Sequence, residues 1–310
     1  MPFLELAIMR LHGVFPILPT PFHDDESLDL ESMTRIVRFM REAQVDGVTV
    51  LGVLGEANRL NNAERDQVIR AALAAAQGLP VIVGASASGT RAARELAQSA
   101  QRLCAAAVMV TPHAEPVPSD ERIFEYYRAI ADGLAIPIVL QDHPASTQVH
   151  MAAGLIARIA NELPAIAGIK EEAVPTAPKI RQLRALLQRP ASILTGLGAL
   201  YAMFDLEAGS DGFNTGFAFP EVLMAMLGAA KAGEWAKARA IYQRFLPLIV
   251  FEQQPGVAIR KEIFRLRGLM VSSKVRHPGA GITPETAAQL RALLDWALPG
   301  ADLKRPIPVA

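Results

Sequence analysis

The sequence has 310 residues, of which 51% are hydrophobic and 20% are charged, enough for one large α/β domain or two small ones. Its 31 basic and 31 acidic residues cancel, so no net charge draws the chain toward nucleic acid or an anionic membrane surface. Its single cysteine excludes an intramolecular disulfide, and no uncharged apolar run reaches the ~18 residues that a membrane span needs. Glu5 and Arg10 interrupt the apolar N-terminus, which argues against a signal peptide, and we expect a cytoplasmic protein that binds neither nucleic acid nor membrane.

Eight short apolar runs, separated by amphipathic stretches, follow one another along the chain. Each run is continuous rather than alternating, which is typical of parallel strands covered on both faces. The predicted strands are Val14–Leu18, Gly47–Leu51, Pro80–Gly84, Ala106–Val110, Ile136–Leu140, Ala165–Lys170, Ser192–Thr195 and Asp211–Thr215. The helical stretches between them include Leu30–Ala43, Asn62–Ala76 and Arg91–Leu103.

This alternation predicts an α/β fold, a closed (β/α)₈ TIM barrel over residues 1–232. A doubly wound open sheet alternates in the same way, but no G-x-G-x-x-G motif follows the first strand. After the eighth strand the chain predicts helices over Pro220–Ala232, Glu234–Phe245, Pro247–Arg267 and Pro284–Trp296. We expect a C-terminal helical domain over residues 233–300 and a poorly ordered tail over residues 301–310.

The mean hydropathy of +0.23 is high for a water-soluble chain. A parallel sheet buried on both faces accounts for part of this value. Apolar surface hidden between subunits would account for the rest, so we expect a homo-oligomer.

Catalytic residues of such barrels lie at the carboxyl ends of the strands, and Lys170 is the one lysine that ends an apolar strand. The other lysines fall on predicted helices, in a loop or in the tail: Lys179, Lys231, Lys237, Lys261, Lys274 and Lys304. A lysine nucleophile must be partly neutral near pH 7, and burial inside a barrel lowers the pKa of the amine in that direction. The alternative is a lysine that emerges at the rim, solvated or paired with Glu171 or Glu172, and position alone does not decide between the two.

A second motif, G-V-L-G-E (Gly52–Glu56), ends the second predicted strand. Its two glycines leave the backbone N–H groups of Val53 and Leu54 free to hold a carboxylate. The alternative is a tight turn that binds nothing, and in either case we expect Glu56 to brace the turn.

Together these strings resemble the dihydrodipicolinate synthase / N-acetylneuraminate lyase family of Schiff-base aldolases. The residues that carry the resemblance are T-P-F (Thr20–Phe22) with Asp29 downstream, G-x-x-G-E (Gly52–Glu56), V-T-P (Val110–Pro112), Pro144 and G-I-K-E (Gly168–Glu171). They follow the family's order and spacing. The resemblance implies a (β/α)₈ barrel with a helical C-terminal domain, a tetramer, and Lys170 as the residue that forms the Schiff base.

The departures from the family pattern bear on the reaction. The family usually carries hydroxyl residues where this chain has Val53 and Leu54, and a tyrosine where it has Gln141. The synthases also have a tyrosine at the position of Ala114 and an arginine at that of Ser146. We therefore expect no lysine-biosynthetic synthase activity. The strings Q-D-x-P-A-S (Gln141–Ser146), L-P-L-I-x-x-E (Leu246–Glu252) and R-H-P (Arg276–Pro278) instead resemble the branch that contains 2-keto-3-deoxy-arabonate-type dehydratases.

Further residues at strand ends are candidates for the site. Gln141 should face the barrel interior and orient a substrate hydroxyl or a water, although an amide is no general base and a purely structural polar contact is an equal alternative. His143, like His113, could supply acid/base chemistry or contact the substrate, and family position suggests that Asn214 binds the keto-acid end of the ligand. Asp142 alternates with Gln141, so it should point away from the interior.

The sequence thus predicts a lyase, a dehydratase or an aldolase, that acts on a 2-keto-3-deoxy sugar acid or a related 2-keto acid. Its catalytic residues would be Lys170 and Gln141, and Val53, Leu54, His143 and Asn214 would bind the substrate. We expect no cofactor and no metal, because no His, Asp or Glu cluster has metal-ligand spacing and the protonated imine itself draws electrons. The alternatives are a pyruvate-dependent condensing aldolase of the dihydrodipicolinate synthase type and a catalytically idle barrel that binds a keto acid.

Overall fold

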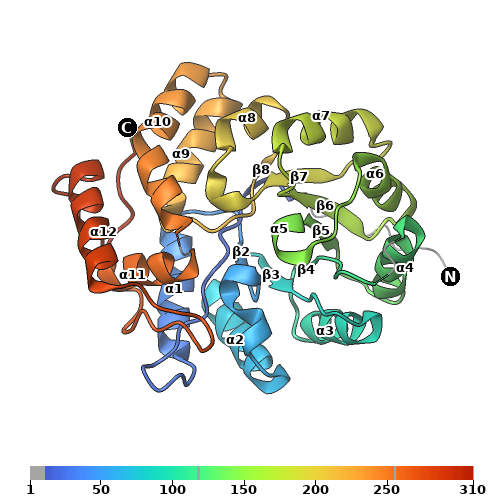
Figure 1. The fold of residues 1–310 in the computed structure, drawn as a ribbon, viewed down its shortest axis with the longest axis horizontal. Coiled ribbons are helices and arrows are strands. Elements are labelled where there is room, and N and C mark those ends of the chain that lie inside the picture. Colours follow the sequence, from blue (N-terminus) through green and yellow to red (C-terminus); the bar gives the residue numbers. More distant parts are fainter. Residues whose placement is uncertain (1–10, 117–118, 255, 310) are drawn as a thin grey trace.

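The computed structural model describes residues 11–116, 119–254 and 256–309. Within these ranges eight parallel strands form one sheet in the order β1-β8-β7-β6-β5-β4-β3-β2, with helices around it (Figure 1). The strands are β1 (Gly13–Val14), β2 (Val48–Val50), β3 (Val81–Gly84), β4 (Ala107–Val110), β5 (Ile138–Asp142), β6 (Ile166–Glu171), β7 (Ser192–Thr195) and β8 (Gly212–Phe213). The predicted (β/α)₈ barrel is confirmed.

The ring closes between β1 and β2 through residues just beyond the regular part of β1. Ile17 forms an isolated parallel bridge with Thr49, whose N–H donates to the Pro16 carbonyl at 2.8 Å. The regular strand is shorter than the predicted Val14–Leu18 because Pro16 has no N–H to donate to a ladder. At β8 the ladder similarly outlasts the regular strand, since Asn214 N donates to Thr195 O at 3.0 Å.

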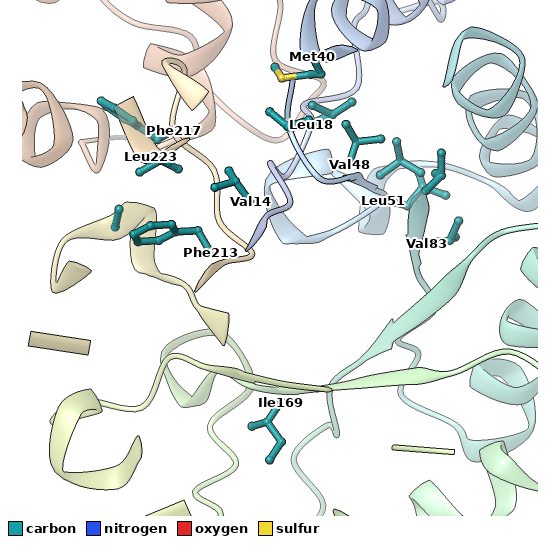
Figure 2. Packing of buried hydrophobic residues seen from close by; sticks show 14 of the residues in the cluster. Val14, Leu18, Met40, Val48, Leu51, Val83, Ile169, Phe213, Phe217 and Leu223 are labelled. Atoms are coloured by element: carbon teal, nitrogen blue, oxygen red, sulfur yellow. The ribbon is translucent and has the colours of Figure 1, made fainter. Parts of the chain in front are cut away.

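Side chains alternate between the two faces of the strand ring, as the period of two requires. One buried cluster fills the interior of the ring, and its members are Leu11, Phe15, Ile17, Ile82, Ala107, Met109, Val139 and Leu194. Their neighbours in sequence, such as Val14, Val83 and Val108, belong to the larger cluster between strands and helices, as does Ile169. Figure 2 shows Ile169 on the outer side of the ring, pointing away from the interior.

Helices cover the outside of the barrel. They are α1 (Leu30–Glu42), α2 (Asn62–Ala76), α3 (Thr90–Arg102), α4 (Asp120–Ala131), α5 (Pro144–Thr147), α6 (Ala153–Glu162), α7 (Thr176–Leu186), α8 (Ala202–Glu207) and α9 (Pro220–Lys231). Short 3-10 turns follow β2 at η1 (Val53–Gly55) and η2 (Ala57–Arg59), and β7 at η3 (Leu197–Ala199). The C-terminal helices α10 (Trp235–Glu252), α11 (Val257–Leu266) and α12 (Pro284–Ala297) gather on one side, with α11 beside α1 (Figure 1).

The prediction that a helix ends before Pro247 is wrong. Helix α10 continues through Pro247 to Glu252, and the break falls before α11, where Gly256 has φ +66°. An interior proline costs about 3 kcal/mol because one backbone hydrogen bond is lost. Phe245, Leu248 and Ile249 are buried on both sides of the proline, and this packing outweighs the local preference.

The expectation of a poorly ordered tail is also wrong for the described residues up to 309. Ile307 is buried, and its N–H donates to Glu221 Oε1 at 2.9 Å. The buried Arg267 guanidinium pairs with the same Glu221 and donates to the carbonyls of Ala218, Leu303 and Arg305. One arginine therefore ties the tail to the loop after β8.

In the part of the chain that the structure describes, no helix is long and apolar enough to cross a bilayer.

We predict that Arg267→Met lowers the free energy of unfolding by about 3–5 kcal/mol, because it leaves the Glu221 carboxylate buried without its cation. Urea unfolding would measure the loss. Arg91→Met is the control, since the Arg91 side chain is 93% exposed and forms a surface pair with Glu95 on the same helix. Equal, small effects of the two substitutions would contradict the role given to Arg267.

Candidate active site

Lys170 lies near the end of β6 with its side chain in the barrel interior. Its neighbour Ile169 points outward (Figure 2), so alternation directs Lys170 inward, opposite Gln141 of β5 in the strand register. The residue is only 4% exposed. Burial lowers the pKa of the Lys170 amine, and the nearby Glu172 carboxylate opposes this shift. The amine is therefore enclosed, as a lysine nucleophile requires, and is not solvated at the rim.

Glu172 is the anionic partner of Lys170. The Lys170 Nζ and Glu172 Oε2 atoms are 3.4 Å apart, and both side chains are buried. Gln141 Nε2 donates to the same Oε2 at 2.7 Å, and the backbone N–H of Leu197 donates to Oε1 at 3.0 Å. Strands β5 and β6 and the turn after β7 thus converge on one carboxylate.

The loop after β7 is shaped to hold this carboxylate. A Cβ at Gly196 would lie 2.2 Å from Glu172 Cγ and Oε1, so only glycine fits there. The next residue, Leu197, has φ +49°, which is rare for a residue with a side chain, and its N–H points at the carboxylate. Such local strain is typical of functional sites.

The Glu172 carboxyl stays ionised near neutral pH. Burial alone would raise its pKa, but the charges of Lys170 and His143 and the hydrogen bonds from Leu197 and Gln141 together hold the pKa below its usual range. An ionised carboxylate next to an amine can take up a proton during a reaction.

Sequence reasoning named Glu172 only as a partner for a solvated lysine and did not include it in the site. The signal was present, because Glu172 lies two residues after Lys170 in an extended segment and therefore on the same face. The Glu172 N–H continues the strand ladder by donating to Asp142 O at 3.0 Å.

His143 lies at the N-terminus of α5, half-buried, and its Nδ1 is 2.6 Å from Ser146 Oγ. Burial lowers the pKa of its imidazole, with Glu172 opposing and Lys170 reinforcing this shift, so His143 is close enough to both to feel their charges. His113 is exposed and lines a cavity of about 870 Å³ together with Tyr126 and His150, and neither Lys170 nor Glu172 lines that cavity. Of the two histidines, His143 is the one that interacts with the Lys170–Glu172 pair.

The Val53–Leu54 turn follows β2 at the same end of the barrel. Val53 is 51% exposed, and Leu54 packs against the interior cluster. Within the described ranges the backbone N–H groups of Val53 and Leu54 have no hydrogen-bond partner, whereas those of Gly55 and Glu56 donate to Gly52 O and Val53 O. Two adjacent free N–H groups can hold a carboxylate.

Asn214 is fully buried in the interior, beyond β8. Its amide nitrogen donates to Thr49 Oγ1 at 2.8 Å and to Phe15 O at 3.3 Å. Both amide hydrogens are thus used by the barrel wall, and the amide oxygen is buried without a partner. The remaining capacity of Asn214 is that of an acceptor, and its contact with substrate stays a prediction.

The outer face of the same strands carries a second buried charge cluster. Asp142 pairs with Lys179 of α7, which also donates to Met151 O at 2.6 Å. Burial and the neighbouring Asp142 charge raise the pKa of Glu171 far above its usual range. Asp142 points away from the interior, as its alternation with Gln141 predicts.

Among the described residues no group of three or more His, Cys, Asp or Glu side chains is arranged to hold a metal ion.

Comparison with known proteins gives a consistent set of similarities. Residues 10–297 match the model of the dihydrodipicolinate synthetase family. An L-2-keto-3-deoxyarabonate dehydratase from Azospirillum brasilense is 37% identical over 293 residues, which cover 92% of this chain and 94% of that protein. A 4-hydroxy-tetrahydrodipicolinate synthase from Chlorobaculum parvum is 32% identical over 294 residues, covering 92% of this chain and 97% of that protein. The crystal structure of a dihydrodipicolinate synthase from Rhodopseudomonas palustris is similar with a TM-score of 0.88 and 38% identity, covering 92% of this chain and 97% of that one.

We predict that Glu172→Gln shifts the pH dependence of Lys170 reactivity to lower pH. The Glu172 charge raises the pKa of the Lys170 amine, so its removal lets burial lower that pKa further. The rate of pyruvate trapping with cyanoborohydride, measured as a function of pH, reports the shift. Glu171→Gln is the matched control, because Glu171 lies on the opposite face of the strand; the same shift in both variants would contradict the assignment.

Proposed function

Since the chain belongs to the dihydrodipicolinate synthetase family, we propose that it is a lyase that forms a Schiff base between Lys170 and a 2-keto-3-deoxy sugar acid or a related 2-keto acid. The observation that carries the proposal is the Lys170 amine, buried in the barrel interior with the Glu172 carboxylate 3.4 Å away. The sequence similarity to an L-2-keto-3-deoxyarabonate dehydratase supports dehydration as the reaction.

The pair can perform dehydration in balanced steps. The Lys170 amine attacks the C2 carbonyl, water leaves, and a protonated imine forms. The imine draws electrons from C3, so the Glu172 carboxylate removes a C3 proton and an enamine results. The enamine electrons expel the C4 hydroxyl, which takes up the proton that Glu172 removed from C3 and departs as water. Hydrolysis of the imine then frees Lys170 and releases the dehydrated keto acid.

The remaining residues would hold the substrate. The free N–H groups of Val53 and Leu54 bind the carboxylate, and Gln141 and His143 orient hydroxyl groups above the imine. Gln141 cannot take a proton at neutral pH, which leaves proton transfer to Glu172 or to His143. In this arrangement Gln141 acts by orienting both the substrate and the carboxylate.

Two alternatives remain distinct from this reaction. The similarity to 4-hydroxy-tetrahydrodipicolinate synthases favours a condensing aldolase that adds pyruvate to an aldehyde. Against it stand Ala114, Gln141 and Ser146, which lack the hydroxyls and the cation that the resemblance assigns to those positions. The third reading is an idle barrel that only binds a keto acid, and the enclosed Lys170–Glu172 pair argues against it.

We also propose that the protein is cytoplasmic and forms a homotetramer. Large apolar side chains are exposed on the surface, among them Val174 and Phe204, which are 62% and 56% exposed and line one cleft. Exposed apolar side chains that lie together mark interaction surfaces.

We predict a tetramer by light scattering at micromolar concentration, and a smaller assembly for Phe204→Asp. A monomeric wild-type protein would contradict this prediction.

The covalent step is tested by borohydride trapping with pyruvate and intact mass. We predict one reduced pyruvyl group on wild-type protein and on Lys237→Arg, an exposed lysine of α10, and none on Lys170→Arg. An adduct on another lysine, or none with any 2-keto acid, would refute the proposal.

The products distinguish the reactions. Consumption of L-2-keto-3-deoxyarabonate without release of pyruvate indicates dehydration, and release of pyruvate indicates C–C cleavage. Consumption of pyruvate only when an aldehyde acceptor is present would establish the condensing alternative instead.

A further inference from the structure

Glu56 directly follows the turn that is proposed to bind the substrate carboxylate. It has φ +54°, and its side chain is 1% exposed. Its N–H donates to Val53 O at 3.1 Å, so the backbone of Glu56 closes the turn whose first two N–H groups are free. The direction of those N–H groups therefore depends on how firmly Glu56 is held.

Three groups hold the Glu56 carboxylate. Arg59 Nη1 donates to Oε2 at 2.6 Å, and the backbone N–H of Arg276 donates to the same oxygen at 3.0 Å. Oε1 forms an ion pair with the Lys261 amine. Arg59 belongs to the same short segment as Glu56 and moves with it. Lys261 comes from α11, more than two hundred residues further along the chain.

Burial and two further contacts fix the Lys261 side chain in this position. Its side chain is 0% exposed, its amine donates to Lys274 O at 2.7 Å, and it lies 4.4 Å from the centre of the Phe22 ring. Among the described residues, Lys261 is the only side-chain cation from outside the turn segment that pairs with Glu56. The C-terminal helical part thus reaches Glu56 through the buried ammonium of Lys261 and through the backbone N–H of Arg276.

We propose that Lys261 is a positioning residue that holds the Val53–Leu54 turn in the conformation that binds the 2-keto acid carboxylate, acting through Glu56. The inference rests on the proposed function of that turn. Removing the ammonium leaves the buried Glu56 carboxylate with one side-chain cation, Arg59, which moves with the turn, and one backbone N–H, that of Arg276. The carboxylate is then held less firmly, and so is the direction of the Val53 and Leu54 N–H groups. Affinity for the carboxylate should fall, while the chemistry at Lys170, on another strand, should not.

The test measures the rate of borohydride trapping against pyruvate concentration. We expect Lys261→Met to raise the half-saturating concentration about tenfold and to change the rate at saturating pyruvate less than about twofold. Lys237→Met should match wild type, because that lysine is exposed and forms a surface pair with Glu234 three residues earlier. Thermal unfolding of each variant verifies that it is folded.

A double-substitution cycle isolates the ion pair. Glu56→Gln keeps the shape of the side chain, and it should raise the half-saturating concentration as Lys261→Met does. The double variant should be no weaker than the worse single variant, because both act through one contact. If Lys261→Met does not fold, Glu56→Gln alone carries the same expectation.

The pH dependence gives a second readout. Burial lowers the pKa of Lys261 to about 8; Glu56 opposes this shift, and the neighbouring Arg59 and Arg276 add to it. Loss of the proton above that pH removes the charge that holds Glu56. The half-saturating concentration of the wild-type protein should therefore rise above about pH 8, and that of Lys261→Met should not show this rise.

The outcomes separate this inference from the function on which it rests. Absence of any wild-type adduct refutes the Schiff-base function before a variant is compared. A normal wild-type adduct with unchanged half-saturation in Lys261→Met and Glu56→Gln overturns the positioning role alone. A fall in the saturating rate without a change in half-saturation overturns it as well.

Discussion

The structure depends on the enclosure of one ammonium and one carboxylate in an apolar barrel. Burying either charge alone would cost several kcal/mol, so each requires the other. The Lys170 amine has Glu172 beside it, and Glu172 also accepts hydrogen bonds from Gln141 and the Leu197 N–H. The Glu172 carboxylate thus has three polar partners, which fix it firmly in the interior. Gly196 has no side chain because Glu172 occupies that space.

Strands β5 and β6 carry charge on both faces, and alternation keeps the two sets apart. Gln141, Lys170 and Glu172 face the interior, while Asp142 and Glu171 face the helices, where Lys179 neutralises part of their charge. The raised pKa of Glu171 leaves it protonated near neutral pH, with Asp142 as the anion that pairs with Lys179. The outer set therefore fixes the ends of both strands without adding a net charge that would act on Lys170.

Much of the barrel was predictable because it follows local rules. Continuous apolar runs identified the strands, the strand-end position singled out Lys170 and Gln141, and alternation placed Asp142 on the outer face. The same alternation would have placed Glu172 beside Lys170 had it been applied one step past the strand. Other features depend on tertiary contacts that no local pattern encodes. Helix α10 passes through Pro247 because the residues on both sides of the proline are buried. The tail is held because Arg267 donates to two carbonyls within it and to the Ala218 carbonyl in the loop after β8.

The C-terminal helical part is also where the barrel mouth is completed. Its buried cations Arg260, Lys261 and Arg267 each form an ion pair with a carboxylate. Lys261 contacts the loop after β2 through its partner Glu56, and the two arginines donate to backbone carbonyls of the loop after β8. Arg260 donates to Gly216 O at 2.6 Å, and a Cβ on that glycine would lie 1.9 Å from the guanidinium. The Lys170–Glu172 pair comes from β6 and the residue after it, whereas the side of the mouth near β8, β1 and β2 is braced from α11. Because a buried charge is costly once its partner is displaced, a change in α11 would act first on the loops that follow β2 and β8.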